Sequence, residues 1–216
     1  ISIPISRVLD PLITNSFFVS TIILNIDSLK FNQNLPLLLT FEVNYYPIMI
    51  ETVQDIINQE VKALQNLVAN DNYQNAVDLI EEQVHQKGGK VVISGMGKAG
   101  QIGINIATTL ASTGTPAVFL HPSESQHGDL GIVQKNDILI LISNSGKTRE
   151  IVELEVLVKR MYPSIKIIGL TGNLEGDLAG FSDVVLYTGA PKEVGPLGLA
   201  PTTSTTVMTV IGDIVI

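Results

Sequence analysis

The sequence predicts an α/β fold in three layers, with a five-stranded parallel sheet between two layers of helices. Short runs of consecutive aliphatic residues recur along the chain, and the clearest is Ile-Leu-Ile-Leu-Ile at 138–142. Such runs are typical of strands that are buried on both faces. They alternate with helix-length segments over short loops, which favours right-handed crossovers between parallel strands. The expected strands are residues 90–94, 117–120, 137–142, 166–170 and 183–187.

The composition agrees with a sheet that is covered on both faces. Of the 216 residues, 45% are hydrophobic and only 16% are charged, which suffices for a large buried core. The net charge of −8 argues against nucleic-acid binding, so local donors would have to hold an anionic small molecule. The chain has no cysteine, which excludes disulfides and thiolate catalysis and fits a cytoplasmic protein. No stretch approaches the roughly 20 apolar residues of a membrane span.

Two amphipathic helices are expected ahead of the sheet. In the first, seven apolar residues recur at helical spacing. They are Val53, Ile56, Ile57, Val61, Leu64, Leu67 and Val68. Asn70 and Asp71 break this pattern and supply the N-cap of the second helix, which ends in glycines at 88–89. Ahead of both helices the pattern is missing, so we expect a functional domain over 49–216 and a poorly defined N-terminal extension over 1–48.

Further helices are expected between the strands and after the last one. They cover residues 101–112, residues 148–161, a short stretch after residue 173 and a final helix that starts near Pro201. Ligands of such sheets bind beyond the carboxyl ends of the strands. The first, second, third and fifth expected strands end in polar or glycine-rich loops that suit such a site, including a polar loop at 121–131.

An anion site is predicted where the third expected strand ends. Ser143-Asn144-Ser145-Gly146 follows that strand, and Thr148 opens the next helix. Backbone N–H groups and short hydroxyl side chains converge there at the positive end of the helix dipole. The alternative is that the hydroxyls serve only as helix N-caps. Two serines, a glycine and a threonine within six residues exceed what one cap needs, so the sequence favours an anion site.

Residues 95–100, Gly-Met-Gly-Lys-Ala-Gly, match the G-x-G-x-x-G pattern of a dinucleotide site. That site also needs an acidic residue at the end of the next strand, and residues 120–122 provide none. NAD binding is therefore disfavoured. A tight turn and a close helix approach account for Gly97 and Gly100 but not for Lys98, whose charge opposes the helix dipole. A nearby anion or polar substrate accounts for Lys98 better.

Three more titratable residues lie at the expected ligand edge of the sheet: His127, Glu150 and Glu193. His127 contacts either the substrate or only its own loop, and the spacing of polar residues in that loop fits no metal site. Each glutamate has the alternative of a solvated charge or a helix N-terminal carboxylate. Together with Lys98 they supply an acid, a base and an electrophile around an anion site. Proton transfer next to a carbonyl group needs this set.

Five segments together resemble the sugar isomerase (SIS) domain and, within it, the D-arabinose-5-phosphate isomerase family. They are residues 94–100, 111–116, 127–131, 143–146 and 196–206. The resemblance implies a five-stranded parallel SIS sheet with flavodoxin-like winding, usually assembled as a homotetramer. It also implies the interconversion of D-ribulose 5-phosphate and D-arabinose 5-phosphate, which feeds Kdo synthesis for lipopolysaccharide or capsule.

The resemblance also implies roles for the candidate residues. The substrate phosphate is bound by Ser143, Asn144, Ser145 and Thr148. Positions associated with catalysis are Lys98, His127, Glu150 and Glu193. Loops around the substrate contribute Gly97, Thr202 and Thr203. One glutamate moves a proton between C1 and C2 through an enediol, and Lys98 stabilises the enediolate oxygen, with no redox cofactor and no metal. Which glutamate is the base stays open.

The alternative function is a non-catalytic module that binds sugar phosphates, either a sensor or a degenerate fragment. Phosphate binding alone needs neither Lys98 nor the two glutamates, so these residues favour an enzyme. The resemblance implies a further active-site histidine beyond the last helix, and the sequence stops at Ile216 inside that helix. We therefore expect a C-terminally incomplete domain with poor turnover.

Overall fold

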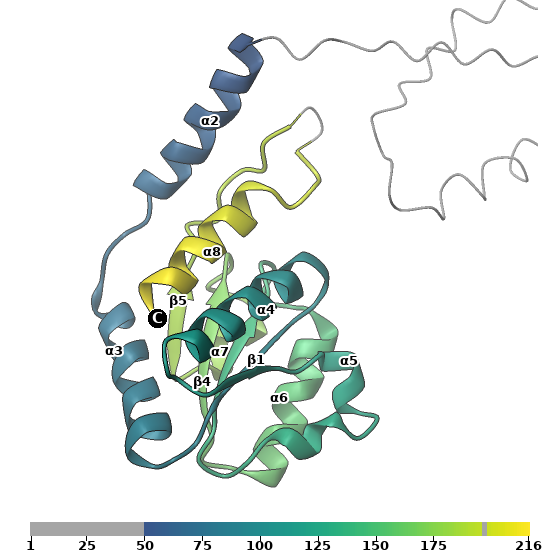
Figure 1. Cartoon of the computed structure of the whole chain (residues 1–216). Coiled ribbons are helices and arrows are strands. Elements are labelled where there is room, and N and C mark those ends of the chain that lie inside the picture. Colours follow the sequence, from purple (N-terminus) through teal and green to yellow (C-terminus); the bar gives the residue numbers. More distant parts are fainter. Residues whose placement is uncertain (1–49, 196–197) are drawn as a thin grey trace, which may run out of the picture. The chain divides into compact units, whose positions relative to one another are not determined.

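Five strands form one sheet in the computed structural model, which describes residues 50–195 and 198–216 (Figure 1). The strands are β1 (Val91–Gly95), β2 (Ala117–Phe119), β3 (Ile138–Ile142), β4 (Lys166–Thr171) and β5 (Val184–Tyr187). All neighbours are parallel, and their order is β2-β1-β3-β4-β5. The predicted five-stranded sheet and its flavodoxin-like winding are confirmed. The expected extension over 1–48 lies outside the described residues.

Helices precede the sheet, connect its strands and follow its last strand. Their bounds are α2 (Ile50–Gln65), α3 (Asp71–Ile80), the π-helix η2 (Glu81–Gln86), α4 (Gly97–Ser112), α5 (Pro122–Ser125), the 3₁₀ helix η3 (Asp129–Ile132), α6 (Arg149–Met161), α7 (Asp177–Phe181) and α8 (Thr203–Ile214). None of the described helices has the length and apolar character needed to cross a bilayer.

Local backbone chemistry sets several helix ends. The side chain of Asn70 accepts the backbone N–H of Asn72 at 3.0 Å and caps α3, as expected. The helix α4 begins at Gly97, earlier than predicted, because the φ of +56° at this glycine lets the chain turn from β1 directly into the helix. The segment predicted as a polar loop contains α5 and η3, and Pro122 at the first position of α5 favours its helical start.

Two apolar clusters cover the two faces of the sheet. In β3, Ile138, Ile140 and Ile142 belong to the cluster that includes side chains of α3, α4 and α8. Leu139 and Leu141 alternate with them and belong to the cluster that includes side chains of α6 and α7. Burial on both faces explains why the strand is a continuous aliphatic run. The three-layer architecture is thus confirmed.

Two lysine–aspartate pairs join the starts of neighbouring strands. Lys90 Nζ lies 2.7 Å from Asp137 Oδ2, and the backbone N–H of Lys90 donates to Asp137 Oδ1 at 3.0 Å, which connects β1 with β3. Lys166 Nζ and the backbone N–H of Ile167 make the same contacts with Asp183, at 2.7 and 2.9 Å, and connect β4 with β5. Asp137 is fully buried, whereas 26% of the Asp183 side chain is exposed.

The Asp183 pair makes a testable contribution to stability against acid. Burial acts to raise the pKa of Asp183, but hydrogen bonds from Lys166 and Ile167 and the charges of Lys166 and Lys159 outweigh burial and lower this pKa. A carboxyl whose folded-state pKa is depressed stabilises the fold above its unfolded pKa of about 4 and loses this contribution as the pH falls through the folded-state value. We expect the contribution to be at most about 1 kcal/mol, because the pair is partly open to water.

Urea unfolding at a series of pH values between about 5 and 2 measures this contribution. Asp183→Asn keeps the size of the side chain and removes its titration. The variant should therefore show a flatter fall in unfolding free energy over this range than the unchanged chain. Identical slopes for the two proteins would contradict the prediction.

Candidate active site

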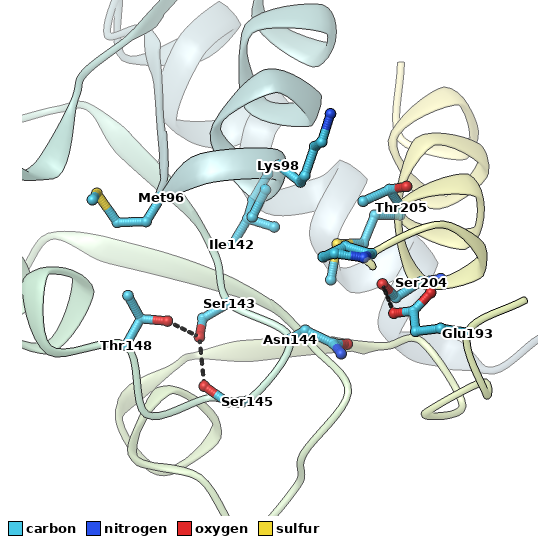
Figure 2. A pocket seen from close by; sticks show the side chains of 13 residues that line it. Met96, Lys98, Ile142, Ser143, Asn144, Ser145, Thr148, Glu193, Ser204 and Thr205 are labelled. Carbon is cyan, nitrogen blue, oxygen red and sulfur yellow. Dashed lines mark hydrogen bonds between the residues drawn. The ribbon is translucent and has the colours of Figure 1, made fainter. Parts of the chain in front are cut away.

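A pocket of about 310 Å³ opens beyond the carboxyl ends of β1 and β3. It lies between the start of α4, the loop from β3 to α6 and the start of α8 (Figure 2). Six of the residues singled out in the sequence line it: Lys98, Ser143, Asn144, Ser145, Thr148 and Glu193. The place of the pocket agrees with the rule that ligands of parallel sheets bind at the carboxyl edge.

Three hydroxyl groups form a cluster on one side of the pocket. Ser143 Oγ lies 2.6 Å from Thr148 Oγ1 and 3.4 Å from Ser145 Oγ. Thr148 is the N-cap residue of α6, yet its side chain makes no capping hydrogen bond. The alternative in which Thr148 serves as a cap therefore does not hold. The cluster stands at a helix N-terminus, where unsatisfied backbone N–H groups and the helix dipole favour an anion.

The segment after β4 holds the loop that carries these hydroxyls in place. Asn173 Nδ2 donates to the backbone oxygen of Ser145 at 2.9 Å, and the N–H of Gly172 donates to the oxygen of Asn144 at 3.0 Å. At Gly176 a Cβ atom would lie 2.9 Å from the Cα of Gly146. The two segments are in such close backbone contact that the second one determines where the hydroxyl loop lies.

We predict that Gly176→Ala displaces this loop and weakens anion binding. The φ of −81° at Gly176 suits alanine, so the change adds no backbone strain of its own, and its effect on the loop comes from the clash with the Gly146 backbone. The dissociation constant for inorganic phosphate, measured by calorimetry, should rise about tenfold, as expected when binding groups are misplaced.

Gly180→Ala is the matched control, because an added Cβ at Gly180 meets no atom of the described residues within 4 Å. Its phosphate affinity should equal that of the unchanged chain. Equal affinities for Gly176→Ala and Gly180→Ala would contradict the bracing role of Gly176.

Glu193 lies on the other side of the pocket (Figure 2). Four hydrogen bonds hold its carboxylate at the start of α8. Oε2 accepts the N–H of Thr202 at 2.8 Å, the N–H of Ser204 at 3.1 Å and the hydroxyl of Thr202 at 3.2 Å. Within the described part of the chain, Oε1 accepts only the hydroxyl of Ser204. Burial acts to raise the pKa of Glu193, but these hydrogen bonds outweigh it and lower the pKa below the usual glutamate value. The group is therefore a carboxylate at neutral pH.

Lys98 lines the pocket from the first turn of α4. It is exposed, and Figure 2 shows its side chain extending away from Ser143 and Thr148. The glycines around it have the turn and packing roles expected from the sequence. Gly97 has a positive φ, and a Cβ at Gly100 would lie 2.6 Å from the backbone oxygen of Gly95.

Five candidate residues do not line the pocket. They are Gly97, His127, Glu150, Thr202 and Thr203. His127 is exposed after α5, and Glu150 is partly exposed in the first turn of α6. Thr202 and Thr203 lie at the start of α8, where Thr202 contacts Glu193 rather than the pocket. The roles of all five in substrate binding or catalysis stay predictions.

Ser204 is a residue of the site that the sequence analysis did not single out. It donates both its hydroxyl and its N–H to Glu193. The run of hydroxyl residues at 202–206 was the available signal, because such residues concentrate at helix N-termini. Among the described residues, no group of three or more His, Asp or Glu side chains is placed to hold a metal ion.

Comparison with known proteins adds independent findings. The SIS domain profile matches residues 83–216. A Bacteroides fragilis structure, assigned as a phosphosugar isomerase involved in capsule formation, is 62% identical, with a TM-score of 0.76 over 77% of this chain and 87% of that one. The Escherichia coli CFT073 protein c3406 in complex with arabinose 5-phosphate is 38% identical, with a TM-score of 0.70 over 77% and 86%. Arabinose 5-phosphate isomerase KdsD of Pseudomonas aeruginosa is 45% identical over 166 residues, which are 76% of this chain and 49% of KdsD.

The chain belongs to the SIS domain family, whose profile covers more than half of its length. Within that family, relatives named arabinose 5-phosphate isomerase and the c3406 structure with bound arabinose 5-phosphate confirm the narrower resemblance seen in the sequence. The chain spans about half the length of the curated relatives that it matches.

Proposed function

We propose that the chain is an aldose–ketose isomerase of sugar phosphates. The observation that carries this proposal is that one pocket holds both a cluster of hydroxyl groups at a helix N-terminus and an ionised carboxylate. The hydroxyls of Ser143, Ser145 and Thr148 lie on one side, and Glu193 lies on the other (Figure 2). A sugar phosphate held by its phosphate group presents its other end to Glu193.

Arabinose 5-phosphate and ribulose 5-phosphate are the proposed substrate pair. The names of the KdsD relatives and the arabinose 5-phosphate bound to the E. coli protein support this choice. In the direction from aldose to ketose, the base removes the proton from C2 and the carbonyl oxygen at C1 becomes an enediolate oxygen. Return of the proton to C1, with proton transfer from the C2 hydroxyl to the C1 oxygen, completes the ketose and needs no redox cofactor.

We propose Glu193 rather than Glu150 as the base, because Glu193 lines the pocket and Glu150 does not. Oε1 of Glu193 accepts one hydrogen bond and has a lone pair left for a proton, whereas Oε2 already accepts three. Lys98 would stabilise the enediolate oxygen by moving its charged end toward the substrate. His127 is proposed to contribute from the loop after α5.

A non-catalytic module that binds sugar phosphates is the second candidate function. The observation that favours it is the capping of the α8 N-terminus by Glu193, because this structural role needs no substrate. In that case Glu193 would stabilise the helix and nothing more. The pocket would then bind the phosphate without moving a proton.

Turnover of arabinose 5-phosphate to ribulose 5-phosphate, followed by a ketose-specific colour reaction, distinguishes the two candidates. The expected result is ketose formation from arabinose 5-phosphate and none from arabinose, which lacks the phosphate group. Phosphate-dependent binding without any turnover would support the binding module and would refute the isomerase.

We also propose that the chain assembles as a homotetramer. As part of the same proposal, it acts in the cytoplasm as an enzyme of Kdo synthesis. The apolar stripe expected on α2 supports self-association, because Val53, Ile57 and Val61 on it are each more than 40% exposed. Burial of this stripe against other copies of the chain would remove these side chains from water. The molar mass by light scattering should accordingly be four times the 23.3 kDa of one chain, and a mass of 23.3 kDa would contradict the tetramer.

A further inference from the structure

A carboxylate on α2 contacts the start of α8 beside the candidate site. Oε1 of Glu60 accepts the hydroxyl proton of Thr203 at 2.9 Å. Thr203 is 1% exposed and is the first residue of α8. The second oxygen of Glu60, Oε2, is buried and has no hydrogen-bond partner among the described residues. The Thr203 hydroxyl is therefore the group that holds this carboxylate within the described part of the chain.

The direction of this hydrogen bond determines what else the Thr203 hydroxyl can do. A threonine hydroxyl has one proton, and a carboxylate can only accept it. With its proton directed to Glu60, the Thr203 oxygen is available as an acceptor, and it accepts the backbone N–H of Val194 at 3.2 Å. Thr202 Oγ1 shares this N–H at 3.1 Å. Glu60 thus orients a hydroxyl that anchors the residue directly after Glu193.

We propose that Glu60 is a positioning residue for the candidate active site. Through the Thr203 hydroxyl it anchors the backbone at Val194 and so keeps the Glu193 carboxylate in the pocket. Neither Glu60 nor Thr203 lines the pocket, so both act through Glu193. The consequence for catalysis rests on the proposed function, whereas the consequence for the ionisation of Glu193 does not. For Thr203 this role differs from the substrate contact expected from the sequence.

The first test follows the ionisation of Glu193 by carboxyl-carbon NMR in the full chain. Thr203→Val keeps the shape of the side chain and removes its hydroxyl, so the Val194 anchor is weakened and Glu193 loses part of its hydrogen bonding. The pKa of Glu193 should then rise toward the value of about 4.3 for an unperturbed glutamate. Thr203→Ser keeps the hydroxyl and should leave the titration as in the unchanged chain.

Thr209→Val is the matched control for the loss of a threonine hydroxyl from α8. Among the described residues, the Thr209 hydroxyl bonds only to the Thr205 backbone oxygen within the helix. The Thr209→Val variant should therefore leave the titration of Glu193 unchanged. An unshifted Glu193 in Thr203→Val, or equal shifts in Thr203→Val and Thr209→Val, would overturn the inference whether or not the chain isomerises sugar phosphates.

The second test uses turnover and removes the two partners separately and together. Thr203→Val and Glu60→Leu should each lower kcat about ten- to a hundredfold and leave KM for the sugar phosphate unchanged, because the phosphate site is intact. The double variant should lose no more than either single variant, since both changes break one connection. Glu60→Gln keeps an acceptor oxygen for the Thr203 hydroxyl, so this variant should retain most of the turnover that Glu60→Leu loses. Additive losses, or a rise in KM alone, would contradict the inference.

Discussion

Glu193→Gln should abolish most of the turnover of the chain while leaving sugar-phosphate binding intact. The amide keeps the size of the carboxylate but cannot take up a proton, so we expect kcat to fall about a hundred- to ten-thousandfold, the usual contribution of general base catalysis. The KM for arabinose 5-phosphate should change little, because Ser143, Ser145 and Thr148 lie on the opposite side of the pocket. Steady-state kinetics on the two proteins measure both quantities.

Glu150→Gln is the matched comparison for this prediction. Glu150 is another glutamate of the proposed catalytic set, but it lies outside the lining of the pocket. Its loss of kcat should therefore be much smaller than that of Glu193→Gln. The reverse order would show that Glu150 is the base and would refute the assignment made from the pocket geometry.

Asp137→Ala should cause the largest loss of stability among the changes considered for this chain. Asp137 is fully buried, and its two oxygens accept Lys90 Nζ and the backbone N–H groups of Lys90 and Gln134. Removing one partner of a buried ion pair costs about 3–5 kcal/mol, because the remaining charge and N–H groups lose their acceptor. This is a large fraction of the about 5–15 kcal/mol that stabilises a typical domain. Urea unfolding measures the loss, and Asp137→Asn gives a milder form if the alanine variant does not fold.

The equivalent pair between β4 and β5 provides the control for burial. Asp183→Ala breaks the same type of contact, but the Asp183–Lys166 pair is partly exposed. We expect a loss of about 1 kcal/mol, since water replaces the lost contacts. Equal losses for Asp137→Ala and Asp183→Ala would mean that burial is not what makes the first pair important.

The sequence alone was sufficient for the sheet and for the cluster of hydroxyl groups that follows β3. The run at 138–142 is buried on both faces, and a continuous aliphatic run is the direct chemical consequence of that burial. The Ser143–Thr148 cluster could be predicted because all of its members lie within six residues of one another. Their spacing along the chain therefore sets their spacing in the fold.

Some local predictions were wrong in detail because the hydrophobic pattern does not reveal the local backbone conformation. The start of α4 depends on a positive φ at Gly97, which periodicity does not reveal. Two short helices begin within the segment 121–131, and its polar composition did not indicate them. The apolar stripe expected to run to Val68 is shorter in the structure, because α2 ends at Gln65.

What only the tertiary structure decided is which distant residues meet. Sequence reasoning placed Glu150 and Glu193 on an equal footing, and only the fold brings Glu193 alone of the two into the lining of the pocket. The hydrogen bonds to Glu193 come from Thr202 and Ser204, which lie 9 and 11 residues further along the chain. Glu60, which acts on Glu193 through Thr203, lies 143 residues before Thr203. Periodicity and motif spacing describe neighbours along the chain. Contacts between separate elements depend on how α2 and α8 pack, and that packing is a property of the whole fold.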